Sequence, residues 1–265
     1  MGYISYELKE GVGLVTFSRP EALNALSKAG VEESLGFFQD LGRKLAGAGS
    51  PEVLAVVLTG AGKAFIAGAD VKEMAGMSPE QACGFSAKGN QLMNEIERLP
   101  VPVIAAVNGY ALGGGFEIAL AADFMYVAAG AKMGLPEVTL GIIPGFGGVR
   151  RLCRRIGAAR AKELVYTGRL VTAEEAFQLG IANRLTSPEA LLDQALQTAA
   201  LIGGAAPMAL RAAKRHANEC VLLDAETAAA VEAERFGALF AGPESAEGMA
   251  ALQEKRKPAW ARKEG

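Results

Sequence analysis

The spacing of apolar side chains changes along the first half of the chain. Residues 3–18 alternate between apolar and polar side chains around a polar break at 9–11, which predicts two strands joined as a hairpin. Residues 53–59, 101–107 and 124–128 are instead short continuous apolar runs. Such runs are typical of strands that are covered on both faces, so a sheet buried between layers is expected.

Two helices carry their start signals in the sequence. Ser27 is placed to cap a helix whose apolar side chains recur every three or four positions over residues 31–45. Asp70 begins a second helix, because its carboxylate can accept from the first free N–H groups. Glu73 stands three residues later, in the position that completes a capping box.

The order of elements then repeats. Pro79 opens a helix that extends to about Arg98, and residues 116–122 form another after a glycine-rich turn at 109–115. Strand, strand and helix therefore follow one another more than once. This order predicts an α/β fold of stacked ββα turns, to which we assign residues 1–200.

The composition changes near residue 201. The remaining segment is rich in Ala, Glu, Lys and Arg at helical spacing, and Pro207 and Pro243 mark helix starts. We assign residues 201–265 to a C-terminal helical region. Its apolar side chains have few partners within the segment, so we expect them to be buried against the core or another subunit.

The charge balance narrows the classes of partner. The formal net charge is −2, whereas a nucleic-acid binder usually carries a basic excess or a basic face. No nucleic-acid partner is therefore expected. One basic stretch, residues 150–162, is interpreted as a solvated helix face, with a role near phosphates or at a subunit contact as the alternative.

The cysteines and the N-terminus bear on the compartment. Cys83, Cys153 and Cys220 are far apart and odd in number, a pattern that fits free thiols in a reducing compartment. The first residues do not read as a signal peptide, and there is no apolar run of about 18 residues. We expect a cytoplasmic protein without a membrane partner.

His216 is the single histidine, and we interpret it as a surface residue. A site that needs two histidines is thereby excluded. Acid–base chemistry would have to use carboxylates, Lys, Tyr or the backbone. No metal site is expected.

Two segments could bind an oxygen that gains negative charge. Residues 62–74 and 107–117 each run from a strand through small residues into a helix start. Small residues let a ligand approach the backbone, and N–H groups at a helix start are unpaired and partly positive. Tight-turn packing is the alternative explanation, since neither segment completes a dinucleotide or phosphate-loop motif.

Two glutamates lie near these turns. Glu117 is one turn into an apolar helix, where a free charge would be costly. Glu137 follows Pro136 in a turn or loop of otherwise apolar residues. Each alone could be a solvated side chain, but together they are candidates for general acid–base catalysis.

These segments resemble the enoyl-CoA hydratase/isomerase family, also called the crotonase superfamily. The resemblance covers nearly the whole chain and implies a crotonase-like spiral of ββα turns with a C-terminal helical appendage. It further implies a homotrimer, or a homohexamer built from two trimers. The matching motifs, in the family's order, are residues 64–74, 108–117, 135–137, 143–148, 164–168, 173–180 and 254–257.

The resemblance also assigns roles within the site. The backbone N–H groups of Ala69 and Gly114 would form an oxyanion hole for a thioester oxygen. Glu117 would be the base that activates water, and Glu137 the proton donor. Since many relatives lack one of these glutamates, the presence of both favours hydration over isomerisation.

The substrate implied by the resemblance is an acyl-CoA thioester, with coenzyme A as part of the substrate and no separate cofactor. Met74, Met77 and Phe85 either shape an acyl pocket or belong to the core. Ile66 and the Val149–Arg150 pair depart from the common family pattern and leave the acyl specificity open. The expected contacts to the coenzyme A part are Ala67, Gly68, Asp70, Val71 and, as the weakest candidate, Lys72.

Taken together, the resemblance implies a short-chain enoyl-CoA hydratase of fatty acid and lipid metabolism. Such an enzyme adds water across the 2,3 double bond of a trans-2-enoyl-CoA and gives a 3-hydroxyacyl-CoA. The alternatives are an enoyl-CoA isomerase and a hydratase for a branched or cyclic enoyl-CoA. Outside enzymes, the alternative is a non-catalytic RNA-binding or scaffold member of the fold.

Overall fold

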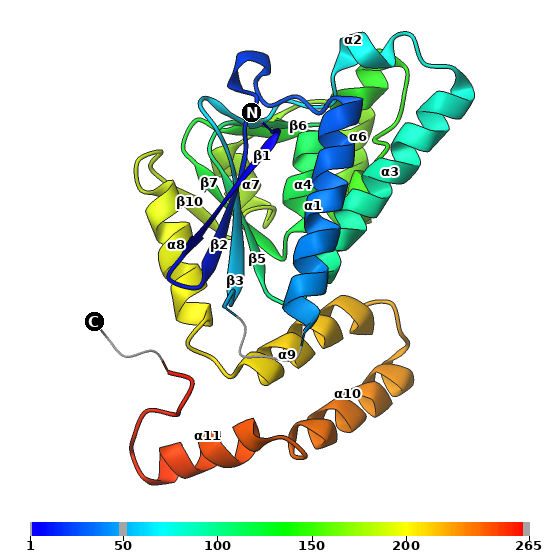
Figure 1. The fold of residues 1–265 in the computed structure, drawn as a ribbon. Coiled ribbons are helices and arrows are strands. Elements are labelled where there is room, and N and C mark those ends of the chain that lie inside the picture. The colour runs from blue at the N-terminus through cyan, green and yellow to red at the C-terminus, as the bar shows by residue number, and fades with distance from the viewer. Residues whose placement is uncertain (1, 48–51, 262–265) are drawn as a thin grey trace.

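The computed structural model describes residues 2–47 and 52–261 (Figure 1). Successive pairs of strands contribute one strand to each of two sheets, in the orders β1-β2-β3-β5-β7-β10 and β4-β6-β8-β9. This repetition confirms the expected ββα turns. The pairs are β3 (Ala55–Gly60) with β4 (Ala64–Ile66), β5 (Val103–Val107) with β6 (Tyr110–Leu112), and β7 (Phe124–Ala128) with β8 (Lys132–Gly134).

The remaining elements complete the two sheets and their connections. β1 (Ile4–Lys9) and β2 (Val12–Phe17) pair antiparallel, which confirms the expected hairpin, and β2 joins β3 in parallel. The glycine-rich turn contains the short strand β6, which sequence reasoning missed. The other short elements are η1 (Pro20–Ala22), η2 (Pro136–Leu140), β9 (Val171–Thr172), α7 (Ala173–Gln178) and β10 (Arg184–Thr186).

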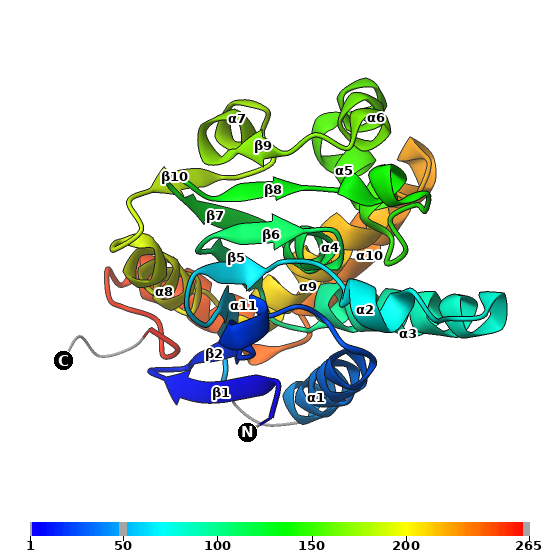
Figure 2. The ribbon, with the colours of Figure 1, turned by 90° about the horizontal axis from the view of Figure 1, so that it is seen from above.

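Helices cover both faces of the larger sheet, as Figures 1 and 2 show. Along β3, Val56 and Leu58 face one apolar core, while Ala55 and Val57 face the other. The first core also contains residues of α1 (Lys28–Ala46), α3 (Pro79–Arg98) and α4 (Gly114–Ala121). The second packs against α8 (Leu191–Ile202). Burial on both faces explains why the strands are continuous apolar runs.

The expected helix starts agree with the structure only in part. α4 begins at Gly114, two residues before the expected start, because glycines can continue into the first turn of the helix. Ser27 caps α1, and α3 begins at Pro79 as expected. Asp70 caps α2 (Val71–Met74), a helix of only four residues. Glu73 does not close a capping box there, because its carboxylate accepts the N–H of Lys28, at 2.7 Å, at the start of α1. That expectation was wrong, because the neighbouring helix start offers its own unpaired donor.

The basic stretch is not uniformly solvated. It lies on α5 (Gly148–Ile156) and α6 (Ala158–Thr167). Arg151 is only 4% exposed, and the guanidinium of Arg155 donates to the carbonyl oxygens of Ile181 and Ala122. The expectation of a solvated face is therefore wrong for these two residues, because each inserts into the core and binds backbone oxygens there.

The C-terminal helices lie below the core in Figure 1: α9 (Pro207–Cys220), α10 (Ala225–Leu239) and α11 (Pro243–Gln253). No described residue of α9 or α10 is buried, and in α11 only Ala251 is. α8 still packs on the sheet, so the change in burial comes after Ile202. None of the helices within residues 2–47 and 52–261 has the length and apolar character needed to cross a membrane.

Two helical glycines should respond in opposite ways to alanine. A Cβ at Gly115 in α4 would lie 2.1 Å from the carbonyl oxygen of Ile66, whereas a Cβ at Gly36 in α1 would meet nothing within 4 Å. We expect Gly115→Ala to destabilise the fold by about 1–3 kcal/mol through overpacking. Gly36→Ala should stabilise it by roughly 0.5–1 kcal/mol. Urea unfolding of both variants measures the difference, and equal effects would contradict it.

Candidate active site

A pocket of about 770 Å³ opens where the turns after β4 and β6 meet η2 and the loop before α5. Its lining is largely apolar and includes Met74, Phe85 and Ile143. Among the described residues that line it, the carboxylates of Glu117 and Glu137 are the charged groups. A concave apolar pocket with a few polar groups is the usual form of a small-molecule site.

The turn before α4 requires glycine. Gly113 has φ of 47°, and a Cβ there would lie 2.8 Å from Oε1 of Glu137. Its N–H donates to the carbonyl oxygen of Gly134 at 2.9 Å. The next residue, Gly114, is the first of the helix, so its N–H has no partner within the helix and borders the pocket.

The second turn holds Ala69 at the same pocket. Gly68, with φ of 104°, accepts the N–H of Leu26 at 2.8 Å, and Asp70 donates to the oxygen of Leu26 at 2.9 Å. The two bonds fix the backbone on both sides of Ala69. Among the described residues, no group accepts the N–H of Ala69 or of Gly114. An oxygen in the pocket could therefore use both donors.

Glu117 is the more deeply buried carboxylate, at 1% exposure. Its Oε1 accepts the N–H groups of Phe146 at 2.8 Å and Gly148 at 2.7 Å, and Oε2 has no such bond within the described chain. Burial raises the pKa of Glu117 to about 7. The hydrogen bond from Gly148 opposes that rise, and the negative charge of Glu137 adds to it.

Glu137 lies on η2 directly after Pro136, which places the turn expected from the sequence in a short 3₁₀ helix. It is 9% exposed, and its Oε2 is buried without a hydrogen-bond partner in the described chain. Burial raises the pKa of Glu137 too. A buried carboxylate oxygen without a partner is costly when ionised and is stabilised by holding a proton.

The structure brings most of the remaining predicted residues to the pocket, but not all. Ala67, Gly68, Val71, Met74, Met77 and Phe85 line it. Asp70 instead caps α2 and forms an ion pair of 3.1 Å with Arg19. Lys72 is exposed on α2, outside the lining.

Sequence reasoning missed the groups that hold the site in place. Phe146 and Gly148 belong to a motif that was recognised only by resemblance, and nothing in their side chains indicates a role for their N–H groups. A Cβ at Gly148 would lie 2.6 Å from Cγ of Glu117, which is why glycine stands there. The signal available was the glycine cluster at 145–148.

Two side-chain amides, of buried Asn24 and half-buried Asn108, support the strand that leads to Ala69. The Asn24 side chain donates to the carbonyl oxygens of Ala61, Ala64 and Phe65. The Asn108 amide donates to Gly60 and Gly62 and accepts the N–H of Gly60. Such amides hold a backbone that has left the regular sheet.

The described part of the chain has no group of three His, Cys, Asp or Glu side chains that could hold a metal ion. The pocket itself offers two carboxylates and two backbone donors. The pair of glutamates can exchange protons, and the two free N–H groups can stabilise an anionic oxygen.

Comparison with known proteins gives consistent matches. A protein named short-chain-enoyl-CoA hydratase from Clostridium acetobutylicum is 42% identical over 251 residues, which cover 94% of each chain. Crotonyl-CoA hydratase from Syntrophomonas wolfei is 41% identical over 258 residues, or 96% of each chain. The crystal structure of enoyl-CoA hydratase from Bacillus anthracis matches with a TM-score of 0.92 at 39% identity, covering 98% of this chain and 99% of the other.

The family model described as enoyl-CoA hydratase/isomerase matches residues 7–263, almost the full length. The agreement extends from sequence to three-dimensional structure, so the expected resemblance and fold class are both confirmed. The chain belongs to the enoyl-CoA hydratase/isomerase family.

Proposed function

We propose that this protein is an enoyl-CoA hydratase that adds water across the 2,3 double bond of a trans-2-enoyl-CoA to give a 3-hydroxyacyl-CoA. The observation that carries the proposal is the meeting of two buried carboxylates, Glu117 and Glu137, with two unpaired backbone donors in one pocket. The names of the Clostridium and Syntrophomonas relatives support a short-chain substrate of fatty acid metabolism.

The backbone donors serve the thioester oxygen. As the oxygen of water bonds to C3, the electrons of the 2,3 double bond shift toward the thioester carbonyl. Its oxygen then carries the negative charge of an enolate. The N–H groups of Ala69 and Gly114 would form the oxyanion hole for this oxygen. Donors fixed in place before the reaction act most strongly on the transition state, and one such donor is worth about 10²–10³ in rate.

The two glutamates divide the proton transfers. Oε1 of Glu117 is occupied by two N–H groups, which leaves Oε2 to accept a proton from water. Glu137 is assigned the proton transfer to C2, and its Oε2, which is buried without a partner in the described chain, is the oxygen that could carry that proton. The carboxyls titrate as a coupled pair, so the active form holds one proton between them.

The reaction needs no further cofactor in this proposal. Water supplies the added atoms, the two glutamates move the protons, and the thioester itself carries the activating group. The coenzyme A part would extend along residues 67–72. Ala67, Gly68 and Val71 border the pocket there, and exposed Lys72 is free to reach a phosphate from outside it.

The three cysteines are free thiols in the structure, which fits a reducing compartment such as the cytoplasm.

Isomerisation and hydration of a branched or cyclic enoyl-CoA use the same oxyanion and remain alternatives. A non-catalytic RNA-binding role would leave the buried glutamate pair without a purpose. A gel shift with RNA at physiological salt tests that role directly.

Loss of the enoyl-thioester absorbance on mixing with crotonyl-CoA tests the proposed hydration. We expect Glu117→Gln and Glu137→Gln each to lower kcat by about 10²–10⁴ because each removes a general acid or base. Glu80→Gln, at an exposed position on α3, is the matched control and should keep full activity. An unmodified protein that hydrates no enoyl-CoA of any chain length would overturn the proposal.

The pKa of Glu117 should depend on the charge of Glu137. Glu117 has a pKa of about 7, partly because the charge of Glu137 disfavours a second anion in the pocket. Glu137→Gln removes that charge, so the ionised form of Glu117 becomes easier to reach and its pKa falls. Carbon-13 NMR of labelled glutamate side chains, assigned with Glu117→Gln, measures the change. A pKa that stays in place or rises contradicts the coupling.

We also propose that the chain forms a homotrimer or homohexamer through residues 201–265. The ring of Phe236 on α10 lies 5.2 Å, between centroids, from the tilted ring of Phe240, the residue directly after this helix. The two residues are 65% and 55% exposed. Leu222 and Leu252 are similarly exposed, at 67% and 80%. Exposed apolar side chains grouped on one segment mark a surface that is covered in an assembly.

A charge on this surface should dissociate the assembly. We expect the unmodified protein to have three or six times the molar mass of the 27.5 kDa chain in light scattering. The double variant Phe236→Asp, Phe240→Asp should shift toward the monomer, since buried unpaired carboxylates are costly at an interface. Glu174→Lys, exposed on α7, is the control. A monomeric unmodified protein contradicts the proposal.

A further inference from the structure

The carboxylate of Glu117 depends on the loop of residues 145–148. The N–H of Phe146 and the N–H of Gly148 both donate to its Oε1. Each N–H is one end of a planar peptide group, and the other end is the carbonyl oxygen of the preceding residue. The direction of the two donors is therefore set by whatever holds the carbonyl oxygens of Gly145 and Gly147.

The carbonyl oxygens of the three peptide groups between Gly145 and Gly148 all accept hydrogen bonds. Gly145 accepts from the hydroxyl of Ser86 at 2.6 Å and the amide of Asn90 at 2.7 Å. Gly147 accepts the backbone N–H of Arg151 at 3.2 Å. Phe146, between them, accepts from Nη1 of the Arg151 side chain at 3.2 Å. The Arg151 side chain thus binds the middle peptide group, which lies between the two whose N–H groups donate to Glu117, and the Arg151 backbone N–H binds the third.

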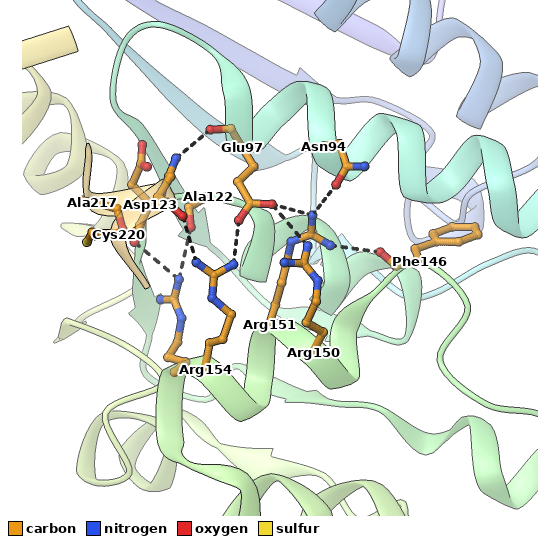
Figure 3. Close-up of polar contacts among 12 residues, drawn as sticks. Asn94, Glu97, Ala122, Asp123, Phe146, Arg150, Arg151, Arg154, Ala217 and Cys220 are labelled. Carbon is orange, nitrogen blue, oxygen red and sulfur yellow. Dashed lines mark hydrogen bonds and ion pairs between the residues drawn. The ribbon is translucent and has the colours of Figure 1, made fainter. Parts of the chain in front are cut away.

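The Arg151 guanidinium is itself fixed by α3, as Figure 3 shows. Nη2 donates to Oε2 of Glu97 at 2.7 Å and to the Asn94 side chain at 3.0 Å. Arg150 and Arg154 also reach Glu97, at 3.5 and 3.4 Å. Their side chains are 49% and 29% exposed, whereas that of Arg151 is 3% exposed. Within this cluster, it is Arg151 that reaches the loop of residues 145–148.

The charges around Glu117 come from three elements. Glu137 on η2 disfavours the ionised form, and Arg151 on α5 favours it. Glu97 on α3 partly neutralises Arg151, with Arg150 and Arg154 beside it. Arg151 is buried, so solvent screens its charge weakly compared with the charges of its exposed neighbours.

We propose that Arg151 is a positioning residue for the reaction: its guanidinium holds the middle peptide group of the Phe146–Gly148 loop, between the two N–H groups that point at Glu117, and its charge keeps that carboxylate available as a base. The planar guanidinium is suited to this task because it bonds the loop and α3 at once in a fixed geometry. A lysine would keep the charge but would lose that geometry.

Four single variants of the full chain test the proposal. Arg151→Gln removes the charge, Arg151→Lys keeps it, and Glu97→Gln removes its counter-ion. Arg150→Gln is the matched control: it breaks an ion pair to the same glutamate and removes a side chain that makes no hydrogen bond to the loop among the described residues. Each is measured by the carbon-13 titration of Glu117 and by kcat and KM for crotonyl-CoA hydration across pH.

The expected shifts have opposite signs. Arg151→Gln should move the titration of Glu117 to higher pH by about half a unit or more, since a stabilising cation is lost. Glu97→Gln should move it to lower pH, because the field of Arg151 is no longer offset. Arg151→Lys should titrate like the unmodified protein. Both Arg151 variants should lower kcat about 10–100-fold, more than they raise KM, because the base is misaligned.

A purely structural role would not produce opposite shifts. The proposal is overturned if Arg151→Gln titrates like the unmodified protein, or if Arg150→Gln produces the same shift. Should Arg151→Gln fail to fold by circular dichroism, an unchanged titration in Glu97→Gln overturns it instead. The rate measurements rest on the proposed hydratase function, but the titration does not. If the unmodified protein has no hydratase activity, the proposed function is refuted. The titration of Glu117 would still test the role of Arg151.

Discussion

The site depends on the two hydrogen bonds that the backbone N–H groups of Phe146 and Gly148 donate to Glu117. The negative charge of a carboxylate that is 1% exposed must be stabilised by nearby groups, and no cation within the described chain contacts this one. Two backbone donors lower the cost of ionisation without neutralising the group. They also occupy one oxygen and leave the other without a hydrogen bond in the described chain. The same two bonds thus orient the carboxylate and oppose the rise in its pKa that burial causes.

The fold provides the geometry that this interaction requires. Each ββα turn sends the chain from the larger sheet to the smaller one and then into a helix. The turns after β4 and β6 therefore end side by side, since these two strands are neighbours in the smaller sheet. Asn24 and Asn108 bind the backbone where it leaves the larger sheet, and Gly113 permits the turn into α4. The N–H of Gly114 is unpaired because α4 begins there, whereas Ala69 lies in the turn just before the residue that caps α2.

Prediction from the sequence succeeded where local physics dominates. Continuous apolar runs identified the buried strands, and Ser27 and Pro79 marked helix starts correctly. It failed where a distant segment competes. Glu73 caps the neighbouring helix instead of its own, and Arg151 points into the core although it stands in a run of basic residues. Neither partner, Lys28 for the first and the Phe146 carbonyl for the second, is identifiable from sequence spacing.

The sequence by itself determined the family and the fold class and indicated the two glutamates as candidates, because motifs in the family's order and apolar periodicity are properties of the chain. Only the tertiary structure decided how those glutamates differ. Glu117 is held by two N–H groups, while Glu137 keeps a buried oxygen without a partner. Burial, and contacts between residues 29 or more positions apart, set these environments. A carboxylate's protonation depends on its surroundings in space, which local sequence does not specify.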